Sequence, residues 1–192
     1  MHYDKAFVTA KLRKWEHVLG TLNLPKWDEL PTLDLYMDQV ISLLKQYLSF
    51  YPEELGGEKV ITQSVINNYV RLKVIPPPVK KRYARIHLAY LIMIGCLKPT
   101  LSISYIQKMV PLELNEEQVS RLYDDFVDMF HTSCGMFIGQ ISKAAEHVLD
   151  PEDSSETSVS TFVCTTALTA GLAKLLTEKL LNIQNESDLS RI

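Results

Sequence analysis

Cysteine is scarce in this 192-residue chain, which excludes two classes of small protein. Cys96, Cys134 and Cys164 lie far apart, so neither a disulfide scaffold nor a cysteine-based zinc finger is expected. Seven glycines and nine prolines exclude a collagen-like or low-complexity chain, and 46% hydrophobic residues exclude a wholly disordered one. The composition therefore predicts a folded protein, and the few cysteines favour a reducing, cytoplasmic location.

Long, strongly apolar runs are also missing. Charged residues interrupt the N-terminal stretch from Met1 to Trp15, so no signal peptide is expected. The longest uncharged run, Thr157 to Ala173, is rich in Ser, Thr, Ala and Gly and falls short of the about 20 strongly apolar residues of a membrane span. We expect no membrane partner.

The most informative absence is that of carboxylates from the middle of the chain. Residues 59–112 contain nine Lys or Arg and no Asp or Glu, whereas residues 1–58 carry a net charge of −3 and residues 113–192 one of −9. A positive segment in an acidic protein indicates a polyanionic partner, because the acidic parts limit indiscriminate binding. Charge alone leaves an ordinary solvated basic face equally open.

Apolar residues recur at helical spacing along most of the sequence, so the predicted fold class is all-α. Expected N-caps are Asp34, Thr62, Ser102 and Asn115, because their side chains can accept backbone N–H groups. The predicted helices are 4–22, 34–50, 62–73, 84–97, 102–110, a long helix after Asn115 and a last helix over 159–183. The long helix has an apolar stripe of Val119, Leu122, Phe126, Met129, Phe130, Phe137, Ile141, Ala145 and Val148. Residues 150–158 read as an acidic, Ser-rich linker, and a two-stranded wing between helices is an option.

The helix predicted at 62–73 carries an unusual polar row. Gln63, Asn67 and Arg71 are spaced four apart and share one face, with Ser64 and Asn68 beside them. Gln and Asn can bind adenine, and Arg can bind guanine, through paired hydrogen bonds in the major groove. The basic cluster Lys80, Lys81, Arg82 and Arg85 follows at once and suits phosphate contacts. A plain surface helix is the alternative, although such a helix usually includes Glu or Lys.

The order of these features resembles the MerR-type winged helix-turn-helix of bacterial regulators. The matching residues are Asn68-Tyr69, Val74-Ile75-Pro76, Arg82-Tyr83, His87-Leu88, Leu91, Ile94 and Leu101-Ser102-Ile103 with Ile106. The resemblance implies a short-winged helix-turn-helix whose helix 62–72 reads bases and whose wing touches phosphates. It implies C-terminal helices for dimerisation. Together with the polar row, it predicts DNA contacts from Gln63, Ser64, Asn67, Asn68, Arg71, Lys73, Lys80, Lys81, Arg82, Tyr83 and Arg85.

More narrowly, three stretches resemble the bacterial domain of unknown function 1836 family. These are Leu-Tyr-Met-Asp-Gln-Val, Asn-Asn-Tyr-Val and Pro-Pro-Pro-Val-Lys-Lys-Arg-Tyr, within about residues 24–112. That family has no assigned activity and supplies only an expected fold. The chain departs from MerR-type proteins at Lys73, where they usually have Gly. Gly56-Gly57 also lengthens the loop at 51–60 before the recognition helix.

Three regions follow from this reading: an N-terminal helix (1–23), a winged helix-turn-helix domain (24–112) and a dimerisation or effector region (113–192). The dimer seam is predicted on residues 115–149, at Leu122, Phe126, Phe130 and Phe137; the alternative is that these helices only cover the core of one chain. His131 and Cys134 are too few to hold a metal, and we expect no metal, no cofactor and no catalytic residue.

The predicted function is a cytoplasmic transcription regulator that binds duplex DNA as a homodimer, with any effector unknown. The first alternative is an adaptor that keeps the winged fold and binds an acidic protein partner. An enzyme is the weakest hypothesis, because no phosphate-binding loop and no hydrolase or metalloprotease motif is present. Asp124, Asp125 and Asp128 are read as a solvated face, and His87 as a packing or phosphate-proximal residue.

Overall fold

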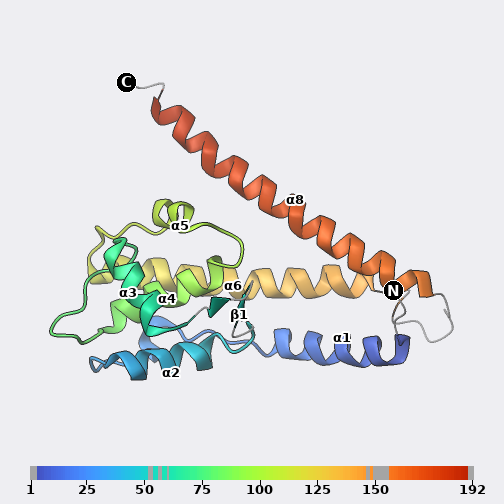
Figure 1. Cartoon of the computed structure of the whole chain (residues 1–192), viewed down its shortest axis with the longest axis horizontal. Coiled ribbons are helices and arrows are strands. Elements are labelled where there is room, and N and C mark those ends of the chain that lie inside the picture. The colour runs from blue at the N-terminus through green and yellow to red at the C-terminus, as the bar shows by residue number, and fades with distance from the viewer. Residues whose placement is uncertain are drawn as a thin grey trace. The chain divides into compact units, whose positions relative to one another are not determined.

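The computed structural model describes residues 4–51, 54–55, 58–59, 61–145, 148 and 156–189. These residues are helical apart from short strands and turns, so the all-α prediction is confirmed (Figure 1). Contacts divide the chain into two compact units: Leu22–His131, and Met1–Thr21 with Thr132–Ile192. The first unit extends beyond residue 112, where the predicted domain ended, because the long helix α6 contributes its first half to that unit's core.

The unit Leu22–His131 holds most of the elements. They are the 3₁₀ helix η1 (Trp27–Glu29), α2 (Met37–Tyr47), β1 (Glu54–Leu55), β2 (Glu58–Lys59), α3 (Gln63–Arg71), α4 (Arg85–Leu97), α5 (Ile103–Met109) and the first half of α6 (Glu116–Ala144). The antiparallel strands β1 and β2 come after α2 and before α3 in the sequence. For this stretch the sequence had predicted only a lengthened loop over residues 51–60. Gly56-Gly57 lies outside the described residues.

Three of the four predicted N-caps are confirmed. The side chains of Thr62, Ser102 and Asn115 accept the backbone N–H groups of Val65, Tyr105 and Gln118 at 3.2, 3.4 and 2.9 Å. The prediction for Asp34 is wrong, since α2 is capped at Tyr36. The helix begins later because Leu35 pairs with Tyr83 through two backbone hydrogen bonds of 2.9 Å, which keeps this segment extended.

The core of this unit is built around α4, which is apolar on nearly all sides and almost wholly buried. A helix that is hydrophobic all round must be surrounded by other elements. Gly95 leaves room for Leu48, the C-cap residue of α2, since a Cβ at this position would clash with Leu48 Cδ1.

The buried line of α6 differs from the predicted stripe. Val119, Tyr123 and Val127, spaced four apart, are each 0% exposed, whereas Met129 is exposed. The predicted stripe included neither Val127 nor Tyr123, whose side chain carries a hydroxyl. In the structure that hydroxyl donates to the carbonyl oxygen of Pro25 at 2.7 Å, so the whole side chain can be buried.

The second unit contains α1 (Lys5–Gly20), the rest of α6 and α8 (Glu156–Leu189). Asp4 caps α1 by accepting the Phe7 N–H at 3.2 Å. Trp15 of α1 packs edge-on against Phe137 of α6 with ring centroids 5.7 Å apart, and the Ser142 hydroxyl donates to Glu16 at 2.6 Å. The predicted linker at 150–158 lies outside the described residues up to 155, and α8 already begins at Glu156.

Helix α8 extends at both ends beyond the predicted 159–183, and most of its described side chains are exposed. Its stretch Val159–Ile183 has the length and composition of a membrane-spanning helix, and almost none of it is buried. The sequence estimate considered only the uncharged run up to Ala173, and the leucines after Lys174 extend the apolar stretch.

Candidate nucleic-acid interface

The polar row predicted on α3 faces outward. Gln63, Asn67 and Arg71 are exposed, while Ile66 and Tyr69 on the opposite side are buried. The Arg71 guanidinium donates to Asn68 Oδ1 at 2.7 Å, so the neighbouring amide orients this cation. Ser64 is exposed and Asn68 partly exposed. The helix therefore presents a row of hydrogen-bonding side chains to a partner.

The end of α3 is shaped by Lys73, whose φ of 54° lies in the left-handed region. The N–H of Val74 donates to the carbonyl oxygen of Tyr69 at 2.8 Å, which closes the helix end as a glycine usually would. Gln107 of α5 covers the same end, since its side-chain amide donates to the Leu72 carbonyl at 2.7 Å. Lys73 thus adopts a glycine-like conformation while keeping an exposed cation.

A tight β-turn follows the proline run and carries two more left-handed lysines. Val79 and Arg82 pair through backbone hydrogen bonds of 3.2 and 2.9 Å, leaving Lys80 and Lys81 as a two-residue loop. Their φ values of 49° and 63° are those of a type I′ turn, in which Asn-Gly is strongly preferred. Each left-handed conformation costs about 1 kcal/mol for a residue with a Cβ. The loop therefore exposes two adjacent cations at a conformational cost.

Arg82 contacts Tyr36, a residue that was not predicted from the sequence to belong to the site. Its guanidinium lies 4.4 Å from the centroid of the Tyr36 ring and donates to the Tyr36 hydroxyl at 2.7 Å. Tyr36 itself is half exposed, at the N-cap of α2. The sequence around Tyr36 does not indicate that its side chain positions Arg82, because the two residues are 46 positions apart.

Two predicted contact residues lie away from an open surface. Tyr83 is 3% exposed and packs edge-on against His87, with ring centroids 5.4 Å apart, so its ring is a packing element. The Arg85 side chain is 16% exposed, lies over the Trp27 ring at 5.4 Å and faces the Asp28 carboxylate at 3.8 Å. Tyr83 is thus buried and Arg85 half-buried against its own chain, and neither is part of the proposed interface.

The comparisons with known proteins name a family for this unit. The sequence matches the family described as Domain of unknown function (DUF1836) over residues 25–126, just over half of the chain. The chain belongs to this family. No curated protein and no solved structure matches it.

The DUF1836 match includes the first part of α6, and its acidic residues have structural partners. Asp124 accepts the Trp27 N–H at 2.8 Å, and Asp128 pairs with the Lys26 ammonium at 2.6 Å. These contacts fasten the connector before η1 to α6. Two of the three carboxylates that were expected to form a solvated face therefore have structural partners: Asp124 bonds to a backbone N–H, and Asp128, just beyond the DUF1836 match, forms an exposed ion pair.

His131 and Cys134 also have roles in packing. The Nε2 atom of His131 accepts the backbone N–H of Leu24 at 3.3 Å. Burial raises the pKa of the Cys134 thiol, which disfavours the thiolate that a metal would need.

His87 links the proline run to the start of α4 and provides a pH-dependent test of this region. Its Nδ1 accepts the Ala84 N–H at 3.0 Å, and Nε2 faces the Pro77 carbonyl at 3.4 Å. Burial lowers its pKa below the ordinary value of 6.5, against the smaller opposing effects of the two backbone hydrogen bonds and of Asp34. The folded protein therefore binds this proton less readily than the unfolded chain.

We expect the free energy of unfolding to fall as the pH drops below about 6.5, by up to about 1.4 kcal/mol per pH unit from this group. Above that pH the contribution of neutral His87 is fully present. His87→Gln keeps an acceptor for the Ala84 N–H and does not titrate, so the variant should lose this part of the dependence. Denaturant unfolding of both proteins between pH 5 and pH 8 measures the difference, and parallel curves would exclude the assignment.

Proposed function

We propose that this protein is a cytoplasmic transcription regulator of the MerR-like type that binds duplex DNA as a homodimer. Its α3 would enter the major groove, and the Val79–Arg82 turn would act as a short wing on the phosphates. The proposal is supported above all by the exposed row of Gln63, Asn67 and Arg71 on a helix in a segment without carboxylates. Such a surface offers base-reading donors and acceptors without repelling phosphate.

The left-handed lysines give a second, independent support. A turn selected only for stability would carry Asn or Gly at positions 80 and 81, because neither residue is strained there. Lysine at both positions, and again at position 73, indicates that the cations are kept for a partner. DNA backbone is the partner whose charge spacing suits a cluster of exposed cations beside a polar helix.

Selection of bound fragments from random duplex DNA tests this proposal directly. We expect a two-fold symmetric site with half-sites one helical turn, about 34 Å, apart. Failure to enrich any sequence at low salt would reject DNA reading by α3 and would leave an acidic protein as the partner of the same surface.

Asn67→Ala and Arg71→Ala should relax the sequence preference. Each lost paired hydrogen bond should reduce discrimination by about 1–3 kcal/mol, or about 5- to 150-fold, at one base position. Fluorescence anisotropy on the selected site and on single-base variants measures this effect. Asn115→Ala, which removes a cap on α6, is a control that should leave the preference at every base unchanged. If the two α3 variants lost the same affinity on every DNA sequence, the proposal that α3 recognises bases would be contradicted.

A further inference from the structure

Helix α8 presents an apolar surface that the rest of the described chain does not cover. Six side chains on it expose between 52% and 69% of their surface. They are Leu168, Leu172, Leu175, Leu176, Leu180 and Ile183. At 100° per residue they fall within one broad stripe, and we call this stripe the leucine face. Exposed apolar patches of this kind mark an interaction site.

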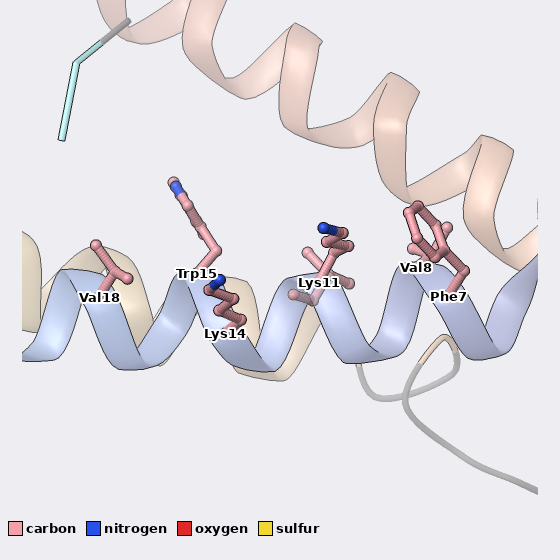
Figure 2. Close-up of a pocket in the computed structure, with 7 residues that line it drawn as sticks. Phe7, Val8, Lys11, Lys14, Trp15 and Val18 are labelled. Atoms are coloured by element: carbon pink, nitrogen blue, oxygen red, sulfur yellow. The ribbon is translucent and has the colours of Figure 1, made fainter.

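A second apolar surface in the same unit also lacks a cover. A groove of about 540 Å³ runs along α1 and is lined by Phe7, Val8, Lys11, Leu12, Lys14, Trp15 and Val18. Figure 2 shows Phe7, Trp15 and Val18 rising from the same side of α1, with Lys11 among them. Phe7 is 61% exposed although it is one of the largest apolar side chains in the helix. We call this surface the α1 groove.

We propose that the α1 groove receives the leucine face of α8 from a second copy of the chain, and that the two copies exchange this contact reciprocally. This inference deepens the homodimer part of the proposed function by assigning its interface. It differs from the seam predicted on α6, since Phe130 and Phe137 pack within the chain against Phe50 and Trp15, with ring centroids 5.4 and 5.7 Å apart.

The area involved suits a stable dimer. Covering the six exposed side chains removes on the order of 600 Å² of surface from each α8, and a stable interface buries about 800 Å² per partner. The α1 groove supplies the remainder. A two-fold symmetric pair contains both contacts, because each copy offers one leucine face and one groove.

The charges along the leucine face do not select its partner. Lys174, Glu178 and Lys179 lie in this stretch, and at 100° per residue Lys179 falls within the face itself. Because Lys11 and Lys14 border the α1 groove, the pairing depends on the apolar area that both surfaces leave uncovered.

The same charges argue against a lipid bilayer as the cover of α8. Lys174, Glu178 and Lys179 lie inside the 25-residue apolar stretch, and charged side chains are costly at that depth. Residues 144–173 contain several carboxylates and no Lys or Arg. A membrane helix is usually flanked by several cations on its cytoplasmic side, whereas here none precedes the stretch and only Arg191 follows it, beside two carboxylates.

Sedimentation of the full chain, without DNA, tests the interface. We expect a mass of twice 21.9 kDa. The double variant Leu172→Gln, Leu176→Gln should raise the dissociation constant of the dimer about 100-fold or more, and Phe7→Glu about tenfold. Val163→Gln is the matched control, because it lies nine residues from Leu172 and so on the opposite side of α8, and it should have no effect.

These residues are exposed in the single chain, so the monomer should keep its fold, which circular dichroism checks. A monomeric wild type would overturn the proposal. Loss of dimer with the α8 variant but not with Phe7→Glu would assign the interface to paired α8 helices instead. Flotation of the wild type with phosphatidylcholine–phosphatidylglycerol vesicles would show a lipid cover. Because no DNA is present, a monomeric wild type would remove the homodimer from the proposed function but would not contradict DNA contacts by α3. Failure of the DNA selection would likewise not contradict this interface.

Discussion

Replacing Lys80-Lys81 by Asn-Gly should weaken DNA binding while making the protein more stable. The type I′ turn needs a positive φ at both positions, and Asn-Gly adopts it with less strain than two lysines. We expect the free energy of unfolding to rise by about 1 kcal/mol. Loss of two cations should reduce the slope of log affinity against log salt by up to about 1.8 and lower affinity up to about 60-fold at 0.1 M salt.

The opposite signs of the two effects make this variant informative. Most substitutions that abolish binding do so by unfolding the protein, whereas this one should bind less and melt at a higher temperature. Denaturant unfolding gives the first quantity, and anisotropy titrations across a salt series give the second. The control is Lys98→Gln, which removes a cation of the same segment at the C-terminal end of α4, the end opposite the turn. Unchanged slopes in Lys80→Asn, Lys81→Gly would remove the turn from the interface.

Tyr36 sets how Arg82 is presented beside this turn. Tyr36→Ala removes both the ring under the guanidinium and the hydroxyl that accepts from it. We expect a smaller loss of DNA affinity, about threefold to tenfold, because the charge remains and only its orientation is lost. Tyr36→Phe keeps the ring and should retain most of the affinity. Equal losses in the two variants would show that the hydrogen bond, not the ring, positions Arg82.

Helical periodicity and capping chemistry predicted much of the fold. Thr62, Ser102 and Asn115 begin their helices as expected, since a short polar side chain before an apolar run has few other uses. Asp34 carried the same signal and failed, because Leu35 pairs with a strand-like residue 48 positions away. Local sequence contains no information about such a distant partner.

The candidate site was predictable in its exposed residues and not in its buried ones. Gln63, Asn67 and Arg71 follow from spacing alone, because four-residue steps place them on one face of a helix. Arg85 was assigned to phosphates by its place in a basic run, and Tyr83 by the resemblance to MerR-type proteins. In the structure Tyr83 is buried and Arg85 lies against Trp27 and Asp28, partners that the local sequence does not identify. Tyr36 and the left-handed lysines needed coordinates, since their roles come from backbone geometry and a contact across the fold.

The second large expected effect concerns the C-terminal boundary of the unit that contains the DUF1836 domain. Residues 22–131 should fold alone, whereas residues 22–112 should not. The longer fragment keeps Val119, Tyr123 and Val127, which are wholly buried against the rest of the unit. Removing three such side chains exposes the apolar surface they cover, and each contributes about 1.5–3 kcal/mol. The total approaches the whole stability of a small domain.

Circular dichroism and denaturant unfolding of the two fragments measure this difference. Fragment 22–131 should unfold in one cooperative transition, and fragment 22–112 should show reduced helicity without one. In the full chain, Tyr123→Ala should cost about 3–5 kcal/mol through the lost ring. Tyr123→Phe should cost about 1–3 kcal/mol, because the Pro25 carbonyl loses its only recorded donor among the described residues. Cooperative unfolding of the shorter fragment would place α6 outside the domain, as the sequence alone had suggested.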